Sequence, residues 1–293
     1  MQGGWLGRSA VRFAVVGVAV LAALVTSIVV IKTAGRPHVP VASLHEPSSP
    51  TPDATPTPEV PALDALPLHP ENKVAGTTPW WSWALVDRRT GESWGSANDE
   101  EGSRTASMVK AWLAALYLRL HPNPSQSWLS TLSTMIRDSN NDAADATHEA
   151  LGGNSPVTSA MKSICGVSAF VPSGHWWAST TISARQQALL GTCIAAGKVD
   201  APKWTQWVLN EMRHVRGGGN FGIRLAFPKA EQSSIAIKNG WSDGWGNGWY
   251  VNCMAIGDTW VLVVETRSGS FGAGTNGCLA ITKQLMKTPA SSG

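Results

Sequence analysis

The sequence predicts an α+β domain whose sheet unites the two ends of the folded region. Segments with the apolar, Trp- and Val-rich pattern of β-strands occur near residues 80–95 and again after residue 235. The residues between these two regions instead show helical periodicity. Strands at both ends that enclose a helical middle are typical of α+β domains.

The elements follow in order from local pattern. A strand is predicted at residues 80–87 (WWSWALVD), and the turn 88–92 leads to a short strand around 93–95. A helix follows at 111–118, because Ala and Leu dominate there, Gly and Pro are absent, and Pro122 ends it. The remaining elements are helical stretches at 128–137, 142–151, 157–164, 182–196 and 201–213, strands at 235–238, 249–257 and 259–266 around a Gly/Trp-rich turn at 239–248, and a last helix near 277–286.

Composition excludes one large class of partner. The chain has 293 residues and a net charge of +3, with 15% charged residues. No basic stripe occurs that would indicate nucleic-acid binding, so no nucleic-acid partner is expected. No Cys-x-x-Cys or His-rich pairing is present either, so neither a metal site nor another cofactor is expected.

Residues 13–31 form an uncharged apolar run about as long as a bilayer core requires. The basic residues on its two sides are nearly balanced and give little direction. We interpret the run as an uncleaved, single-pass transmembrane signal anchor behind a short N-terminal segment, residues 1–12. A cleaved signal peptide is the main alternative, although the run is longer than the usual apolar core and residues 33–35 make a poor cleavage site.

The composition changes abruptly after the apolar run. Ten prolines occur between Pro37 and Pro70, with Ser, Thr and Ala between them. Such a segment cannot bury a core, so residues 32–75 are expected to form an extended, semi-rigid spacer. An anchor followed by this spacer would hold the folded domain, predicted at residues 76–288, on the extracytoplasmic side of a cell membrane.

Four cysteines lie in the second half of the chain: Cys165, Cys193, Cys253 and Cys278. Their even number suits two disulfides in an extracytoplasmic domain. Four cysteines allow three pairings, and the sequence does not choose between them. We favour Cys165–Cys193 and Cys253–Cys278, because each bond then joins neighbours in order.

Ser107 and Lys110 are the first candidates for chemistry. They lie three residues apart at the N-terminus of the predicted helix, so their side chains share one face. A serine hydroxyl becomes a nucleophile when a base takes its proton, and an amine held partly out of water can be that base. The helix N-terminus adds backbone N–H groups where an oxyanion would form. This spacing alone is common, and most such pairs lie on solvated faces.

Two further motifs follow in order, Ser139-Asn140-Asn141 and Lys238-Asn239-Gly240. Together with Ser107-x-x-Lys110 they resemble the S-x-x-K, S-D-N and K-T-G motifs of class A β-lactamases and penicillin-binding proteins. The resemblance covers roughly residues 76–287. It implies a β-lactamase-like serine hydrolase fold, with an antiparallel sheet formed by both ends of the domain and a helical subdomain.

The resemblance also implies catalytic roles for five motif residues. Ser107 would attack a carbonyl and become acylated, and Lys110 would accept or relay its proton. Ser139 would pass a proton to the leaving nitrogen. Asn141 would hold the substrate amide and Lys110, and Lys238 would supply positive charge near Ser139 and the substrate carboxylate.

Substrate binding is carried over to the segment that follows Lys238. The resemblance implies that Asn239, Gly240 and Trp241 contact the substrate. The backbone N–H groups of Ser107 and Trp241 would form the oxyanion hole. The strand behind Lys238 would pair with an extended substrate.

The chain departs from the family pattern in three places. Asn140 replaces an Asp and Asn239 replaces a Thr, and both keep hydrogen-bonding capacity. The third departure is larger, because class A enzymes carry a loop with a glutamate that activates the deacylating water. Here no Asp or Glu occurs between Glu149 and Asp200, so efficient β-lactam turnover is not expected.

Other residues near the expected site have plainer interpretations. His175 lies roughly where the glutamate loop should be, and histidine is a residue type that can act as a base, but we interpret His175 as a structural or solvated histidine rather than a replacement base. The tryptophans between residues 241 and 249 border the expected cleft and would suit stacking on sugar rings. Core packing and turn geometry are the default interpretation of these rings.

The sequence therefore predicts a membrane-anchored, extracytoplasmic serine hydrolase that forms an acyl-enzyme on Ser107. The expected partners are a peptidoglycan-type D-alanyl peptide, another amide or ester, or a β-lactam small molecule, together with the membrane contacted through residues 13–31. A true β-lactamase with a different deacylating base is one alternative. A slowly deacylating or non-catalytic sensor domain is the other.

Overall fold

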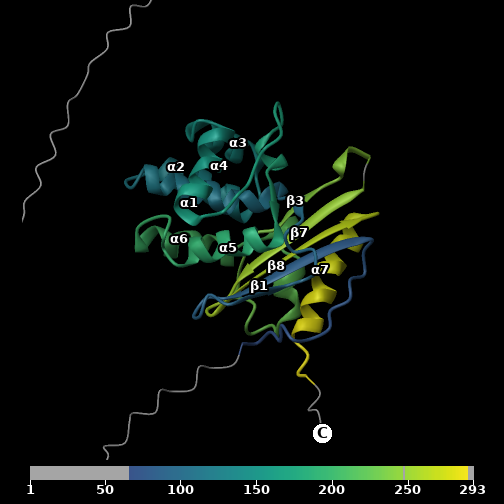
Figure 1. Ribbon diagram of the computed structural model, residues 1–293. Coiled ribbons are helices and arrows are strands. Elements are labelled where there is room, and N and C mark those ends of the chain that lie inside the picture. The colour runs from purple at the N-terminus through teal and green to yellow at the C-terminus, as the bar shows by residue number, and fades with distance from the viewer. Residues whose placement is uncertain (1–65, 247, 290–293) are drawn as a thin grey trace, which may run out of the picture. The chain divides into compact units, whose positions relative to one another are not determined.

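The computed structural model of the protein describes residues 66–246 and 248–289, and within them an antiparallel sheet forms the centre of the domain (Figure 1). The strand order is β2-β1-β8-β7-β5, and β6 also pairs with β7. The strands are β1 (Trp80–Asp87), β2 (Ser93–Gly95), β5 (Ala236–Ile237), β6 (Gly240–Ser242), β7 (Trp249–Ile256) and β8 (Trp260–Ser268). The two ends of the domain thus meet in one sheet, which confirms the predicted α+β class.

The pairing of β1 with β8 is the seam that joins the two ends. All eight residues of β1 have partners on β8, from Trp80 opposite Arg267 to Asp87 opposite Trp260. Residues of β8 alternate between the two faces of the sheet, because successive side chains of a strand point in opposite directions. Both faces of the sheet are covered, so most of β8 is buried, and its first five residues, Trp260 to Val264, are all apolar.

Helices α5 (Ala184–Ala195) and α7 (Phe271–Leu285) cover the two faces of the sheet. The other helices are α1 (Lys110–Leu120), α2 (Gln126–Arg137), α3 (Asn141–Ala150), α4 (Asn154–Cys165) and α6 (Pro202–Arg213). A Cβ on Gly191 of α5 would meet Val261, whereas one on Gly277 of α7 would meet Thr266. These two β8 residues have opposite parity, so α5 and α7 lie on opposite faces of the sheet (Figure 1).

Helix α1 is the centre of the helical subdomain. Its residues from Lys110 to Leu118 are all buried, which is the pattern of a helix that is surrounded by other elements. It contacts α2, α3, α4, α5 and α6. The short helix η1 (Ala106–Val109) runs directly into it. A small second sheet pairs β3 (Gly102–Arg104), which lies just before η1 in the chain, with β4 (Thr181–Ser183), which lies just before α5.

Three elements differ from the sequence-based prediction. The helix expected at 182–196 begins as strand β4, because Thr181 and Ile182 pair with β3. The expected turn at 239–248 contains strand β6, whose Gly and Trp residues are poor strand signals. Helix α7 begins at Phe271 rather than near 277, since Ser270 caps it and its glycines fit closely against the sheet.

Residues 66–75, which composition assigns to the spacer, lie against α7. Leu68 is only 1% exposed, the His69 N–H donates to the Leu285 carbonyl, and Asn72 Nδ2 donates to the Lys287 carbonyl. The folded unit therefore includes at least these ten residues. Elsewhere in the described residues, no helix is both long and apolar enough to cross a bilayer. The predicted anchor at 13–31 and the rest of the spacer lie outside the described residues.

Two disulfides join helices to their neighbours. Cys165 at the end of α4 bonds to Cys193 of α5, and Cys253 of β7 bonds to Cys278 of α7. The favoured pairing is therefore confirmed. The first bond ties the helical subdomain together, and the second fixes α7 to the sheet.

Candidate active site

Ser107 stands in η1, immediately before α1. The preceding residue, Ala106, has φ of 45°, a left-handed conformation that is uncommon for a residue with a side chain. Such local strain persists only where the surrounding structure holds it, and here Ala106 is 2% exposed. The N–H groups of a first helical turn lack intrahelical acceptors, so they stay available to a ligand at Ser107.

Strand β6 approaches the backbone at Ser107 so closely that only glycine fits at position 240. A Cβ there would lie 2.2 Å from the Thr105 carbonyl oxygen and 2.7 Å from the Ser107 backbone nitrogen. Gly240 thus lets Trp241, the next residue, lie beside Ser107 on the wall of the same cavity. Steric exclusion of any side chain therefore explains why the Lys238-Asn239-Gly240 motif ends in glycine.

Lys110 is fully buried and points at the Ser139 segment. Its Nζ donates to the Ser139 carbonyl at 2.5 Å and to Asn141 Oδ1 at 2.8 Å, and lies 3.5 Å from Ser139 Oγ. Burial lowers the pKa of Lys110 to about 7, while the charge of Asp145 acts in the opposite direction. A substantial fraction of this amine is therefore neutral near pH 7 and able to accept a proton.

Ser139 lies between the two buried lysines. Lys238 is 0% exposed, and its Nζ donates to Ser139 Oγ at 3.0 Å and to the Asn239 carbonyl at 3.1 Å. Burial, followed by the positive charge of Lys110, lowers the pKa of Lys238 well below the ordinary lysine value. A hydroxyl in contact with two amines can relay a proton between them.

Asn140 explains how the chain accommodates the first departure from the family motif. Its side-chain oxygen accepts a hydrogen bond from the Ala143 N–H at 2.7 Å and so caps helix α3. Asn and Asp are about equally good in this position. The cap also holds the chain after Ser139, whose own φ is 56°.

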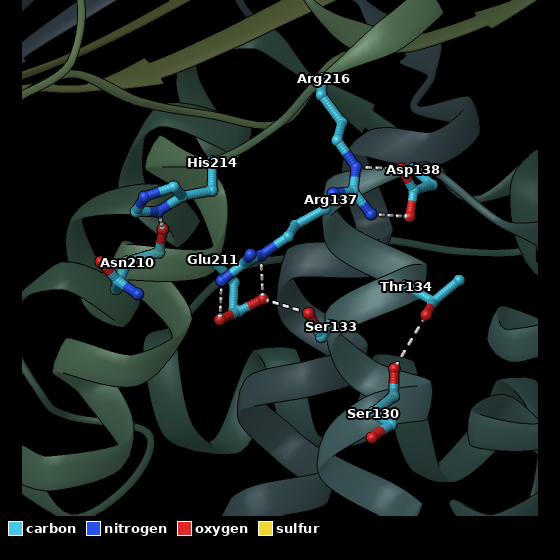
Figure 2. Close-up of polar contacts among 9 residues, drawn as sticks. All are labelled: Ser130, Ser133, Thr134, Arg137, Asp138, Asn210, Glu211, His214 and Arg216. Atoms are coloured by element: carbon cyan, nitrogen blue, oxygen red, sulfur yellow. Dashed lines mark hydrogen bonds and ion pairs between the residues drawn. The ribbon is translucent and has the colours of Figure 1, made fainter.

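Two Arg–carboxylate pairs anchor the end of α2 just before Ser139 (Figure 2). Arg137 donates to both oxygens of Glu211 on α6, at 2.6 and 2.7 Å, and Ser133 also donates to Glu211. Arg216 forms a second bidentate pair with Asp138, at 2.6 and 2.9 Å. The neighbours of Ser139 are thus tied to α6 and to the loop that follows it.

The two predicted binding residues Asn239 and Gly240 build the wall behind the cavity. Asn239 is 1% exposed, and its amide donates to the carbonyls of Gly219 and Phe221 at 3.0 and 2.8 Å. Neither Asn239 nor Gly240 lines the cavity itself. Trp241 does line it, and its ring lies 5.6 Å from that of Phe221 and 5.7 Å from that of Phe271.

These elements enclose a cavity of about 190 Å³. It is lined by Arg104, Ala106, Ser107, Ser139, Asn141, residues 176–179, Trp241 and Ser242. The lining contains one ionisable side chain, the cation Arg104, and neither a carboxylate nor an imidazole. Among residues 66–246 and 248–289, no group of three or more His, Cys, Asp or Glu is arranged to hold a metal ion.

The wall at residues 176–179 is aromatic. Trp177 is 1% exposed, and its ring centroid lies 4.9 Å from Lys110 Nζ. The indole N–H groups of Trp176 and Trp177 both donate to Asp145 Oδ1, at 2.5 and 2.7 Å. His175 is exposed and does not line the cavity. Its position agrees with the interpretation of a solvated histidine.

Sequence reasoning did not single out Trp177, Asp145 or Arg104. The available signal for Trp177 was the Trp176-Trp177 pair inside the acid-free segment. Asp145 and Arg104 carry no comparable local signal, because the contact of Asp145 spans 32 residues and Arg104 reaches the cavity from β3.

Comparison with known proteins establishes the fold. Neither a protein-family model nor a curated protein matches the sequence. Among solved structures, the TLA-3 extended-spectrum β-lactamase is 13% identical with a TM-score of 0.59, and the match covers 74% of this chain and 95% of that one. A β-lactamase from Chitinophaga pinensis DSM 2588 is 16% identical with a TM-score of 0.59, over 70% of this chain and 92% of its own. L2 in complex with relebactam is 16% identical with a TM-score of 0.60, over 70% and 90%.

The chain therefore has the α+β fold of class A β-lactamases, as its motifs predicted. At this identity the similarity shows the fold alone.

Proposed function

We propose that this chain is a serine hydrolase that forms an acyl-enzyme on Ser107. One observation carries the proposal: Ser107 faces a cavity at whose base Ser139 Oγ lies 3.5 Å from Lys110 Nζ and 3.0 Å from Lys238 Nζ. Two buried amines whose pKa values are lowered are unusual in a structural role, and perturbed pKa values cluster at functional sites.

In the proposed reaction Lys110 takes the proton of Ser107, whose oxygen attacks the substrate carbonyl carbon. The oxyanion is stabilised by the backbone N–H groups of Ser107 and Trp241. The carbonyl–nitrogen bond then breaks, and Ser139 passes a proton to the leaving nitrogen. Lys110, now protonated, gives that proton back to Ser139 across the 3.5 Å that separates its Nζ from Ser139 Oγ, and Lys238 Nζ donates a hydrogen bond to Ser139 Oγ. The acyl group remains on Ser107 as an ester.

The proposed substrate is an anionic acyl compound, either a D-alanyl peptide or a β-lactam. The cationic lining residue Arg104 favours a carboxylate in the cavity. Among the described strands β6 pairs only with β7, so its other edge is available to an extended peptide. The L2 structure contains relebactam, and a variant of an ancestral class A β-lactamase, 19% identical, is bound to 5(6)-nitrobenzotriazole as a transition-state analogue.

The location belongs to the same proposal. An anchor at residues 13–31 and a Pro-rich spacer would hold the domain within the cell-wall layer on the extracytoplasmic side. Two disulfides suit an oxidising compartment. Native exported protein should therefore react with no alkylating reagent until it is reduced, and should then take up four equivalents. Free thiols in the exported protein would contradict this location.

A sensor that retains its acyl group is the second candidate function. It is favoured by the cavity lining, which holds no carboxylate or imidazole to activate water. True β-lactamase activity would require Lys110 itself to serve as the deacylating base. The lifetime of the acyl group separates these alternatives.

Labelling with a fluorescent penicillin tests the proposal. The native protein should acquire one label, which peptide mass mapping should assign to Ser107. Ser107→Ala should acquire none while it keeps the native circular dichroism spectrum. Label on another serine, or persistent label in the variant, would overturn the proposal.

A further inference from the structure

Trp177 lies beside Lys110 on the cavity wall where hydrolysis of an ester on Ser107 would need water. Its side chain is 1% exposed, and its ring centroid is 4.9 Å from Lys110 Nζ. The residue also lines the cavity that Ser107 faces. An indole face at this place fills space next to the amine with apolar surface.

A hydrolytic water needs polar partners and a base. An ordered water in a protein usually makes two to four hydrogen bonds. The Trp177 ring has one polar atom, Nε1, and it already donates to Asp145 Oδ1 at 2.7 Å. The indole face of Trp177 therefore offers no acceptor that would hold a water against an ester.

Asp145 holds this wall in place. Its Oδ1 accepts hydrogen bonds from both indoles, and the rings of Trp176 and Trp177 lie 4.4 Å apart. Asp145 is four residues after Asn141 on α3, so the two side chains share one face of that helix. The helix that presents Asn141 to Lys110 thus also fixes the ring of Trp177.

We propose that Trp177, held by Asp145, is a cover that keeps water away from the ester on Ser107 and so sets the lifetime of the adduct. The inference rests on the proposed function and names the residue that controls its second step. In that step a water oxygen attacks the ester carbonyl carbon, the bond from carbon to Ser107 Oγ breaks, and a proton returns to that oxygen as the acid leaves. Trp177 acts by position and takes no proton.

The cover makes formation and loss of the adduct separable. Formation uses Ser107, Lys110 and the oxyanion donors, none of which Trp177 touches through a hydrogen bond. Trp177→His replaces the indole by a smaller ring with a nitrogen that can accept a proton from water near neutral pH. Trp177→Phe keeps an apolar ring but a smaller one, and removes the bond to Asp145.

The experiment measures both rates in the full-length chain with a fluorescent penicillin and intact mass. Trp177→His should shorten the adduct lifetime by about tenfold or more, because general base catalysis is typically worth about 10²–10⁴-fold. Its rate of adduct loss should also rise with pH across about 6.5, the ordinary range of an imidazole. The rate of adduct formation should stay within about threefold of native, whereas a collapsed site would lose both steps.

Two further variants keep the test decisive. Trp177→Phe should give a lifetime between those of the native chain and Trp177→His. Asp145→Ala changes an exposed residue, and should shorten the lifetime even if the Trp177 variants do not fold. Trp204→His is the matched control, since this indole also donates one hydrogen bond, to the Pro122 carbonyl, but lies on α6 outside the cavity lining.

The outcomes are distinct. Unchanged lifetimes in Trp177→His and Asp145→Ala, on a chain that forms the adduct, would overturn the cover alone. A lifetime that shortens equally in Trp204→His would also overturn it. If the native chain forms no adduct at all, the proposed function fails and the cover fails with it.

Discussion

The two walls of the cavity differ in what they can do chemically. The wall built by η1, the Ser139 segment and β6 brings a serine, a backbone approach that only glycine permits, and two buried amines into contact. The second wall, residues 176–179, contributes two indole rings to the cavity, and both of their N–H groups donate to Asp145. Attack on a carbonyl and removal of the resulting ester make separate demands, and this domain meets the first far better than the second.

The walls also differ in how they are held. The first depends on the backbone: Ala106 and Ser139 have positive φ, and Gly240 packs against the Thr105 carbonyl. The second depends on side-chain hydrogen bonds to one exposed carboxylate. Substitutions at the first wall should therefore be costly, whereas the exposed Asp145 of the second wall can change with less effect on folding.

The largest effect is expected from the residues that make the first wall reactive. Ser107→Ala should abolish covalent labelling, and Lys110→Met should slow it by about 10²–10⁴-fold, the usual contribution of a general base. The two losses should not add, because the residues act as a unit. Lys162→Met, at an exposed position of α4, is the control and should label at the native rate. Native labelling in Lys110→Met would show that the wall does not need its amine.

Gly240→Ala tests the close approach of β6 to η1. The new methyl group would overlap the Thr105 carbonyl, so β6 must shift, and overpacking of this kind costs about 1–3 kcal/mol. We expect the initial labelling rate to fall strongly, whereas urea unfolding should show only this modest loss of stability. Gly272→Ala is the matched control, since a Cβ there meets nothing within 4 Å and Ala is the better helix former. If both variants label at the same rate, the close approach of β6 to η1 is not the reason for glycine at position 240.

These two walls also show how far sequence reasoning reaches. The three motifs and the strand periodicity are local signals, and they were enough for the α+β fold and for Ser107, Lys110, Ser139, Asn141, Lys238 and Trp241 on or beside one cavity. The favoured disulfide pairing, which rested only on the order of the cysteines, is also confirmed. The motif prediction of a β-lactamase-like fold is confirmed by the solved structures.

What the sequence missed depends on tertiary contacts. Strand β6 forms from a Gly- and Trp-rich segment because Gly240 pairs opposite Asn252 of β7. The buried position of Leu68 overrides a Pro-rich composition through its packing against the domain. The Asp145–Trp177 bond joins α3 to a loop that carries no pattern of its own. Pairing partners and long-range side-chain contacts are not encoded in local periodicity.

The pH dependence of the first wall follows from burial of its lysines. Adduct formation should rise about tenfold per pH unit below 7 and level off above it, since neutral Lys110 is the reactive form. The folded pKa of Lys110 is about 7 and the unfolded pKa is near the ordinary lysine value of 10.5, so the unfolded chain holds more protons between these two values. The free energy of unfolding should therefore increase with pH across that interval, with Lys238 acting in the same direction. Urea unfolding of the native chain and Lys110→Met at pH 7 and pH 10 checks the sign, and an equal rise in both would contradict it.

The smallest effects are expected from the two ion pairs behind Ser139. Arg137→Met leaves Glu211, which is 5% exposed, without its main partner, and should cost about 1–3 kcal/mol of stability. Arg216→Met breaks an exposed pair and should change stability little, because such pairs contribute weakly. Both should lower the labelling rate modestly, since both pairs flank Ser139. If urea unfolding shows Arg216→Met to be the less stable variant, the Arg137–Glu211 pair is not the stronger of the two pairs in Figure 2.

The difference between the walls is tested most directly by the lifetime of the penicilloyl adduct on the native chain. The protein is mixed with excess penicillin, freed of unbound reagent, and followed by intact mass with the adduct mapped to its residue. We expect a one-to-one adduct on Ser107 that persists for minutes or longer, because the proposed function supplies the groups for acylation and the proposed cover at Trp177 keeps water from the ester. Rapid adduct formation followed by sub-second loss would contradict it.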